Sequence, residues 1–449
     1  LTMQRPESAR RRPQSARQPA ASDAKAKEAP PTGGDPAGRV RVAVRVRPRT
    51  QQELSPDSDF ADVVEMEPEI NAMRLRKNRW ETDTYTFDSV FASNSSQRRV
   101  YDAVGRPVVE SVLEGYNGTV LAYGQTGTGK THTMGNLGEK ADGRAQRGIV
   151  LRSVEDLLKL SEEDSRYTTA LSFSYVQIHN EQVYDLLAPN YEPLAIVENP
   201  HTSDVALQGA KSHPLTDLES FTKVLAASEK HRIVANQRLN AASSRSHAVL
   251  TVSVDRDPVD LGDERSEQQI MNGIRSKLRL VDLAGSERIN KSGSTAGALL
   301  EEAKAINLSL TSLGKCINAL AQDNPGHVPY RESKLTRLLR DSFGGASRTS
   351  LVVTLSPAPE NLSESSSSVQ FGQRALKVEN AVKLQQVADY RMVCKKQSAE
   401  IEALQAREEA LQAEATASLA RAQTAEARAA EAEARAAEAE RRALAASAP

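Results

Sequence analysis

The feature that most constrains this chain is a glycine-rich run at residues 124–132. It reads Gly-Gln-Thr-Gly-Thr-Gly-Lys-Thr-His and contains the complete pattern G-x-x-x-x-G-K-T. Glycines let successive backbone N–H groups curl around a polyphosphate, and the positive end of the following helix faces the same anion. Lys130 can then reach the β- and γ-phosphates, while the Thr131 hydroxyl can bind Mg²⁺. The apolar run Thr119–Tyr123 fits the strand that enters such a loop. The sequence therefore predicts a nucleoside triphosphate site.

A second polar segment, Asn240–His247, lies directly before an apolar strand pattern. Its adjacent hydroxyls, Ser243 and Ser244, suit contacts with Mg²⁺ and a γ-phosphate. Arg245 beside them can pair with a carboxylate and close a site. Taken alone, this segment could equally be a polar surface turn.

A third segment, Leu280–Glu287, reads Leu-Val-Asp-Leu-Ala-Gly-Ser-Glu. An apolar strand here delivers Asp282 to a metal, and Gly285 leaves its backbone amide open to the γ-phosphate. Asp282 alone could be a helix cap. Because the three segments occur together and in this order, we expect them to form one catalytic site.

Composition narrows the class of protein. The 449 residues carry 58 Lys and Arg against 59 Asp and Glu, and the net charge of -1 gives no global signal for nucleic acid or a membrane surface. Only Cys316 and Cys394 are present, too few for a disulfide framework or a thiolate zinc site, which fits a reducing cytosol. No apolar run approaches the roughly 18 residues that span a bilayer. We expect an intracellular protein without a membrane span or a nucleic acid partner.

The chain divides into regions of different composition. Residues 1–38 are rich in Ala, Pro, Ser and Arg and have no apolar period, which predicts a disordered basic arm. Residues 39–377 alternate strand and helix patterns, as in an α/β domain with three layers around a central sheet. Strands are expected at Val40–Val46, Leu171–Gln177, Ala248–Val254, Lys277–Leu283 and Ser350–Leu355, and helices around Val100–Leu113, Leu218–Glu229 and Leu308–Ala321.

Residues 387–449 are rich in Ala, Glu and Arg, which are strong helix formers, so a long helix is expected. Glu431–Arg435 and Glu438–Arg442 are favourable pairs four residues apart. One heptad frame places apolar or small side chains at its a and d positions: Val387, Tyr390, Cys394, Ile401, Leu404 and Leu411. Beyond Leu411 these positions are mostly Ala, which buries little area. A coiled-coil homodimer and a solvated single helix both remain open.

These residues resemble a kinesin motor domain from about Arg39 to Gln385. Further segments carry the resemblance: Val44–Pro48, Val112–Gly118, Tyr184–Leu187, Glu301–Asn307, His327–Arg337 and Phe371–Ala375. Glu198–Val205 and Val378–Asn380 are similar to the plant and algal armadillo-repeat kinesins. The resemblance implies a P-loop NTPase fold with a mixed central sheet flanked by helices. It also implies ATP and Mg²⁺ as ligands, microtubules as partner and a place on the cytoplasmic cytoskeleton.

The resemblance implies roles for single residues in the nucleotide site. The adenine would be enclosed by Arg45, Arg47, Pro48 and His132. The phosphates would be bound by Gly124, Gln125, Thr126, Gly127, Thr128, Gly129, Lys130 and Thr131. Thr131 and Ser244 would bind Mg²⁺, and Asp282 would hold a metal-bound water. Gly285 would sense the γ-phosphate. Arg245 and Glu287 would form an ion pair that closes the site, with Glu287 also positioning and deprotonating the attacking water.

The resemblance also implies a mechanical output. The microtubule face would be a basic cluster of Lys291, Lys315, Arg331, Lys334, Arg337 and Arg340. Residues 378–386 would be a neck linker, with Asn380 as its docking residue. A motor followed by its helix suggests movement toward the plus end. The alternative is a non-motile microtubule-binding scaffold or regulator, but the catalytic set above is complete. A GTPase is disfavoured because Asn290-Lys291 is followed by Ser-Gly and not by the guanine-binding pattern Asn-Lys-x-Asp.

Overall fold

The computed structural model describes residues 38–54, 62–78, 80–135, 143–188, 190, 192–198, 205–238, 245–259, 272–287, 298–388 and 390–446. The expected arm at 1–38 lies outside these residues except for Gly38. Ser243, Ser244 and Lys291 also lie outside them. No helix in the described ranges combines the length and the apolar character needed to cross a membrane.

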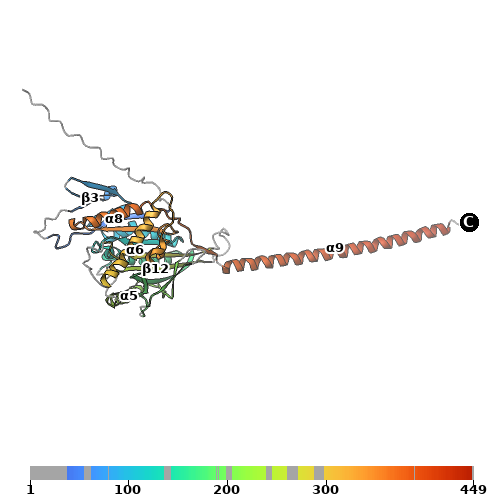
Figure 1. The fold of residues 1–449 in the computed structure, drawn as a ribbon. Coiled ribbons are helices and arrows are strands. Elements are labelled where there is room, and N and C mark those ends of the chain that lie inside the picture. Colours follow the sequence, from blue (N-terminus) through green and yellow to red (C-terminus); the bar gives the residue numbers. More distant parts are fainter. Residues whose placement is uncertain are drawn as a thin grey trace, which may run out of the picture. The chain divides into compact units, whose positions relative to one another are not determined.

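A ten-stranded mixed sheet forms the centre of the domain (Figure 1). Its strands are β1 (Arg41–Val46), β5 (Ser89–Phe91), β6 (Gly118–Tyr123), β7 (Tyr167–His179), β8 (Gln182–Asp185), β11 (His213–Pro214), β12 (His247–Pro258), β13 (Asn272–Asp282), β14 (Arg348–Leu355) and β15 (Gln386–Ala388). The order is β11-β7-β12-β13-β6-β14-β1-β5, with β8 paired to β7 and β15 to β13. Each strand expected from the sequence overlaps a strand of this sheet, with Val40 and Leu283 just outside β1 and β13.

Two small sheets lie beside the main one. They comprise β2 (Val64–Glu67), β3 (Ala72–Arg76) and β4 (Thr82–Thr86) in one, and β9 (Ala195–Glu198) with β10 (Val205–Gln208) in the other.

The middle of the main sheet is parallel and fixes the place of the phosphate loop. β6 pairs in parallel with both β13 and β14, and the register sets Asp282 opposite Ala122. The last residues of β6 and β13 therefore meet at one edge of the sheet. In open α/β sheets, ligands bind beyond the carboxyl ends of parallel strands.

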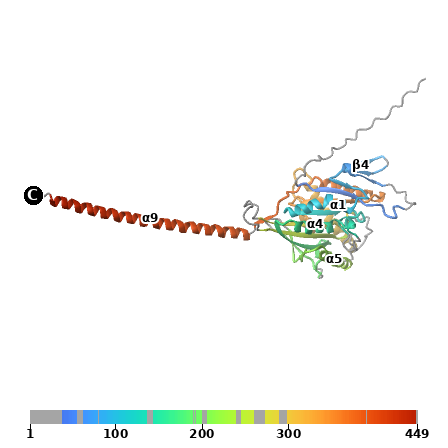
Figure 2. The same ribbon diagram turned by 180° about the vertical axis from the view of Figure 1, so that it is seen from behind.

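Helices cover both faces of the sheet. The helices are α1 (Gln97–Val104), α2 (Arg106–Leu113), α3 (Lys130–Met134), α4 (Ile149–Glu163), α5 (Leu218–Arg238), α6 (Ala298–Leu320), α7 (Lys334–Leu338), α8 (Leu362–Ala375) and α9 (Tyr390–Ala446), with short 3-10 turns η1 (Pro68–Ile70), η2 (Arg144–Gln146), η5 (Tyr330–Glu332) and η6 (Pro359–Asn361). α6 and α8 lie on the face seen in Figure 1, and α1 and α4 lie on the opposite face, seen in Figure 2.

Successive side chains of each strand point to opposite faces of the sheet, so the domain has two hydrophobic cores, one on each face. In β6, Leu121 joins the core shared with α6, α7 and α8, whereas Val120 and Ala122 join the core shared with α1, α2, α4 and α5. This period of two is what a sheet buried on both sides requires. The observed three-layer α/β architecture agrees with the sequence prediction.

Several element boundaries differ from the prediction: α5 ends at Arg238 and not at Glu229, and α6 begins at Ala298 and not at Leu308. The helix expected over Val100–Leu113 is broken at Gly105 into α1 and α2, because Pro107, in the first turn of α2, has no N–H to donate and its ring clashes with the turn before it. The C-terminal helix, expected from 387, begins at Tyr390, since Val387 and Ala388 pair with β13 as part of β15. In α9 the two expected pairs are present, Glu431–Arg435 and Glu438–Arg442, each at 2.6 Å.

Candidate nucleotide and microtubule sites

The phosphate loop leaves β6 and enters α3. Gly124, Gly127 and Gly129 have φ values of 150°, 80° and 97°, in the region that favours glycine. A Cβ at Gly127 or Gly129 would meet nothing within 4 Å, so the backbone conformation, and not crowding, demands these glycines. The loop therefore leaves open space over its backbone, where a phosphate could approach.

Lys130 is buried at the first residue of α3. Its ammonium donates hydrogen bonds to the carbonyl oxygens of Gly124 (2.8 Å) and Gln125 (3.0 Å). Burial lowers the pKa of Lys130, and the nearby carboxylates of Asp282 and Glu287 oppose that shift. Because burial disfavours the charged form of this ammonium, an anion placed beside it would stabilise that form.

Thr131 and Asp282 meet at the adjoining ends of α3 and β13. The Thr131 hydroxyl donates to Asp282 Oδ2 at 2.8 Å. The other carboxylate oxygen, Oδ1, is buried and has no hydrogen-bond partner among the residues that the structure describes. A hydroxyl beside a buried, unpaired carboxylate oxygen fits Mg²⁺, which prefers oxygen ligands and needs few of them from the protein. No cluster of three or more His, Cys, Asp or Glu side chains suited to a metal occurs in the described ranges.

The segment after Asp282 contacts the phosphate loop directly. Ser286 N–H donates to Gly124 O at 3.1 Å, and the Glu287 carboxylate accepts from the Thr126 N–H (2.9 Å) and hydroxyl (2.5 Å). A Cβ at Gly285 would overlap both Thr126 Oγ1 and the Glu287 carboxylate, so only glycine allows this approach. The predicted Arg245–Glu287 ion pair stays a prediction, as do the roles of Ser243 and Ser244.

A cavity of about 370 Å³ adjoins the loop and holds the residues predicted to enclose adenine. It is lined by Arg45, Arg47, Pro48, Ser93, Asn94, Ser95, Ser96, Gln97, Thr128, Gly129, His132, Thr133, Ala145 and Gln146. Partial burial and the charge of Arg45 lower the pKa of His132, although the residue as a whole is exposed. The imidazole is therefore neutral at pH 7 and suited to stack on a base.

Both arginines of this cavity are held by hydrogen bonds. Arg45 donates to Gln97 Oε1 (2.8 Å) and Thr133 Oγ1 (3.0 Å). Arg47 donates through both terminal nitrogens to Glu53, at 2.8 and 2.7 Å. The Arg47 guanidinium in turn holds the pKa of Glu53 down to about 2. The planes of both guanidinium groups are thus fixed within the wall.

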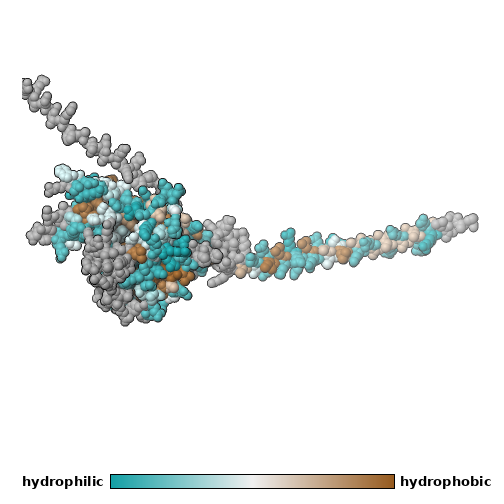
Figure 3. Space-filling view, in the orientation of Figure 1, coloured by the Kyte–Doolittle hydropathy of each residue, from teal (hydrophilic) through white to brown (hydrophobic). Residues whose placement is uncertain are grey.

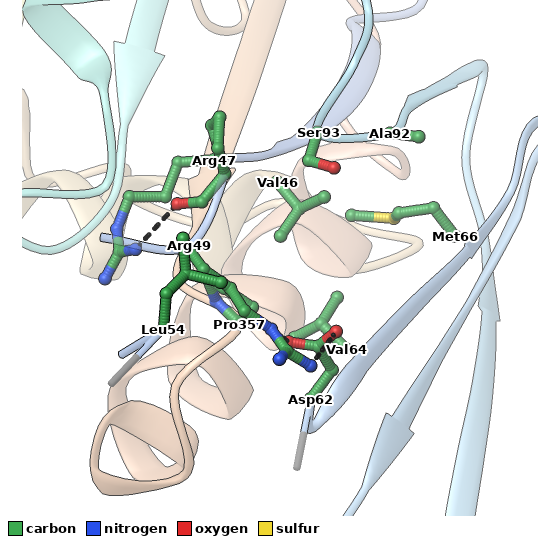
Figure 4. Close-up of a pocket in the computed structure, with 11 residues that line it drawn as sticks. Val46, Arg47, Arg49, Leu54, Asp62, Val64, Met66, Ala92, Ser93 and Pro357 are labelled. Atoms are coloured by element: carbon green, nitrogen blue, oxygen red, sulfur yellow. Dashed lines mark hydrogen bonds and ion pairs between the residues drawn. The ribbon is translucent and has the colours of Figure 1, made fainter. Parts of the chain in front are cut away.

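A second cavity, of about 400 Å³, shares Arg47, Pro48 and Ser93 with the first. Figure 4 shows its apolar side chains, such as Val46 and Met66, together with the ion pair of Arg49 and Asp62, at 2.8 Å. It contains no phosphate-loop residue, so the first cavity is the better candidate for the base.

Several residues that support the site are not marked by any pattern in the sequence. Gln97 accepts from Arg45 and donates to the His132 carbonyl at 2.7 Å, and Thr354 shares a 2.7 Å hydrogen bond with Thr128. Glu53 holds Arg47 as described above. None of these lies in a recognisable motif, and Gln97 and Thr354 reach the site only through tertiary folding.

Comparison with known proteins decides the family. The profile of the kinesin motor domain family matches residues 45–378. The chain belongs to the kinesin motor family. It is similar to the Kinesin-like protein KIN-UB of Oryza sativa subsp. japonica, with 53% identity over 82% of this chain and 42% of the relative. It is also similar to the Kinesin-like protein KIN-UA of Arabidopsis thaliana, with 52% identity over 82% of this chain and 40% of that protein.

The chain thus spans about two fifths of the length of these curated relatives. A solved structure of a fast kinesin matches with a TM-score of 0.70 and 34% identity, covering 78% of this chain and 95% of that one. The kinesin fold is therefore shown, and the resemblance seen in the sequence is confirmed. The finer assignment to armadillo-repeat kinesins stays a prediction.

The basic cluster expected to bind microtubules is partly ion-paired within the kinesin domain. Lys315 in α6 pairs with Glu332 at 2.7 Å, and Arg331 and Arg337 share Glu198 at 3.1 and 2.8 Å. Burial alone would raise the pKa of Glu198, but the two arginines bring it below its ordinary value. The remaining described members are Lys334 in α7 and Arg340, which lies over the Tyr330 ring at 5.6 Å. Acidic neighbours therefore orient three of the cationic side chains.

The predicted neck linker is bound along the domain. Asn380 is buried, and its amide nitrogen donates to the carbonyl oxygens of Ser342 (2.9 Å) and Ser347 (2.6 Å). Its amide oxygen accepts the Gly344 N–H at 2.7 Å. The chain then continues through Gln385, which accepts from Arg275 N–H at 3.1 Å, into β15. The linker thus occupies a strand-like position beside β13.

Proposed function

We propose that this kinesin motor domain hydrolyses ATP at residues 124–131 and uses the cycle to move along cytoplasmic microtubules, toward their plus ends. The observation that carries the proposal is the direct contact between the phosphate loop and the segment from Asp282 to Glu287. Four hydrogen bonds join them, at 2.8, 3.1, 2.9 and 2.5 Å. A change in what the loop holds is therefore expected to alter that segment.

The chain supplies positioning and charge for phosphoryl transfer. Lys130 neutralises charge on the β- and γ-phosphates, and the loop backbone donates hydrogen bonds to them. Thr131 directly, and Asp282 through a metal-bound water, would hold Mg²⁺, which would neutralise further charge on the phosphates. Glu287 orients the attacking water and accepts its proton, a role open to a carboxylate at the rim of the loop. Arg45, Arg47, Pro48 and His132 would form the wall that encloses the adenine.

The output passes through elements attached to the moving segment. Release of the γ-phosphate lets such segments relax, and the relaxation is passed to the elements they contact. Binding to acidic tubulin through Lys315, Arg331, Lys334, Arg337 and Arg340 weakens as salt rises. The bound position of Asn380 supports a linker that docks and undocks during the cycle. A homodimer through α9 remains part of the proposal.

Two measurements on one preparation test the function. The steady-state ATPase rate is measured with and without microtubules, and again after chelation of Mg²⁺. Gliding of polarity-marked microtubules over the immobilised protein reports movement and its direction. We expect a stimulated, Mg²⁺-dependent rate and gliding with minus ends leading, the sign of a plus-end-directed motor. Microtubule binding without stimulated hydrolysis would favour the non-motile scaffold, and gliding with plus ends leading would reverse the direction proposed.

A further inference from the structure

His247 is a buried imidazole to which the nucleotide mechanism above assigns no role. It begins β12, two residues after Arg245, and only 2% of its surface is exposed. Its Nδ1 accepts the Ala284 N–H at 3.0 Å, and its Nε2 lies 2.8 Å from Ser309 Oγ. A backbone N–H can only donate, so Nδ1 carries no proton. The proton is therefore on Nε2, which donates to Ser309.

The two partners of this imidazole belong to different functional parts. Ala284 lies between Asp282 and Gly285, in the segment that contacts the phosphate loop. Ser309 is buried in α6, six positions before Lys315 on the same helix. Lys315 belongs to the basic cluster proposed to bind microtubules. One rigid ring thus connects the nucleotide side of the domain to the helix that carries a microtubule-binding residue.

The His247 ring that joins Ala284 and Ser309 is neutral, and because it is buried, water cannot easily take the place of either hydrogen-bond partner. Burial, with the nearby charges of Lys130 and Arg232, lowers the pKa of His247 to about 3, so the ring stays uncharged at working pH. A displacement of Ala284 relative to Ser309 would leave a buried donor or acceptor unpaired, which is costly. The three groups should therefore move together.

We propose that His247 is a positioning residue that couples the segment Asp282–Glu287 to α6 through this pair of hydrogen bonds. The proposal rests on the proposed function, because the coupling is measured as the stimulation of the ATPase rate by microtubules. A merely structural histidine would affect stability alone. A positioning role therefore predicts that the variants lose microtubule stimulation of the ATPase while their stability is unchanged, whereas a structural role does not.

His247→Asn separates the two hydrogen bonds. The amide oxygen of Asn can take the place of Nδ1 and accept from Ala284, but its shorter side chain does not reach Ser309. Ser309→Ala removes the same bond from the α6 side. Ser228→Ala is the matched control, since Ser228 is also buried on a helix but donates only within its own helix, to Val224 O at 2.8 Å.

We expect His247→Asn and Ser309→Ala to lower the microtubule stimulation factor about tenfold, the effect of one lost hydrogen bond. Basal ATPase and the KM for ATP should stay within about twofold in Ser309→Ala, since Ser309 lies in α6, outside the phosphate loop and the segment Asp282–Glu287. The double variant should be no worse than either single one, because both remove the same bond. Ser228→Ala should keep wild-type stimulation. Wild-type stimulation in both test variants, or an equal loss in Ser228→Ala, would overturn the proposal.

Hydrogen exchange gives a readout that needs no microtubules. Amide exchange over residues 308–320 is compared in ADP-bound and nucleotide-free protein, with thermal unfolding as the check on folding. We expect a nucleotide-dependent difference in the wild type that Ser309→Ala abolishes. No such difference in the wild type, or its persistence in Ser309→Ala, overturns the role of His247. Failure of wild-type microtubule stimulation bears instead on the proposed function.

Discussion

The carboxylate of Glu287 is hydrogen-bonded to Thr126, which lies 161 positions earlier in the chain. One oxygen accepts the Thr126 N–H at 2.9 Å and the other accepts its hydroxyl at 2.5 Å. Gly285 makes this approach possible, since a side chain there would occupy the same space. Glu287 is therefore placed at the phosphate loop by contacts with the loop itself. A shift of either segment changes the position of the carboxylate.

Glu287→Ala should keep ATP binding but nearly abolish turnover. Loss of a positioned general base costs about 10²- to 10⁴-fold in rate. Binding is retained because Lys130 and the loop backbone hold the phosphates. Turnover is measured as phosphate release with saturating microtubules, and binding with a fluorescent ATP analogue. Ser286→Ala is the control, since the Ser286 contact with the loop uses its backbone N–H. Wild-type hydrolysis in Glu287→Ala would remove Glu287 from the mechanism.

The layout of the candidate nucleotide site can largely be predicted from the sequence, because its main parts are local in sequence. The glycine pattern fixes the loop conformation, and Asp282 ends an apolar strand. Parallel pairing of β6 with β13 then brings the two together. The loop conformation follows from the spacing of the glycines, and the position of Asp282 follows from the apolar strand pattern before it.

The parts that the sequence did not reveal depend on distant partners. Gln97 reaches Arg45 from 52 positions away, and no local pattern marks it. Val387 fits an apolar heptad position, yet it joins a strand, because pairing with β13 outweighs helix propensity at the end of the helix. The acidic partners of the basic cluster were missed for the same reason, since Glu198 lies 139 positions from Arg337.

His132→Ala should raise the KM for ATP roughly five- to 160-fold, because stacking of a base on an aromatic side chain contributes about 1–3 kcal/mol. The value of kcat should change little, since His132 is assigned to the adenine and not to the phosphates. Steady-state kinetics separate the two constants. His132→Phe is the control, because it keeps an aromatic face, and it should retain most of the affinity. Equal KM values for the Ala variant and the wild type would exclude stacking on His132.

The pH dependence of ATP binding follows from the same residue. The pKa of His132 lies below the ordinary value of 6.5, so the ring is neutral throughout pH 7–8 and protonates only as the pH falls below that value. The wild-type KM for ATP should therefore be flat between pH 7 and 8. A titration within that range that disappears in His132→Phe would show that the imidazole has a higher pKa.

Arg331→Ala and Arg337→Ala should differ in their effect on stability. Arg331 is 83% exposed at its side chain and Arg337 is 23% exposed, although both pair with Glu198. Both variants should weaken microtubule binding and reduce its salt dependence. Only Arg337→Ala should also lower the melting temperature, by about 2–4 °C, since an exposed pair contributes little. Co-sedimentation at two salt concentrations and thermal unfolding measure these effects. Unchanged microtubule affinity in both variants would place the binding face elsewhere.

Asn380→Ala should release the neck linker from the domain. The change leaves the Gly344 N–H and two carbonyl oxygens without their buried partner, and each unpaired group costs about 1–3 kcal/mol. A cost of about 1.4 kcal/mol already shifts an equilibrium tenfold. We expect faster hydrogen exchange over residues 378–388 and slower microtubule gliding, with basal ATPase retained. Lys383→Ala, at an exposed linker position, is the control and should glide at the wild-type rate. Wild-type gliding by Asn380→Ala would show that docking at this residue does not limit movement.

Dimerisation through α9 should depend on three of its apolar side chains. Ile401, Leu404 and Leu411 are 55%, 59% and 58% exposed in the single chain, and apolar side chains stand out along this helix in Figure 3. Burying each would contribute about 1.5–3 kcal/mol. Replacing all three by Ser should therefore weaken self-association at least a hundredfold, measured by sedimentation at micromolar concentration.

Leu419→Ser provides the matched control for this last change. Leu419 is 62% exposed but lies outside the a and d positions, so its loss should leave association nearly unchanged. An equal effect of Leu419→Ser would show that the apolar side chains of α9 associate without a coiled-coil register. A wild-type chain that sediments as a monomer under these conditions would favour the solvated single helix, because the Ala-rich positions beyond Leu411 add too little buried area to hold two copies together.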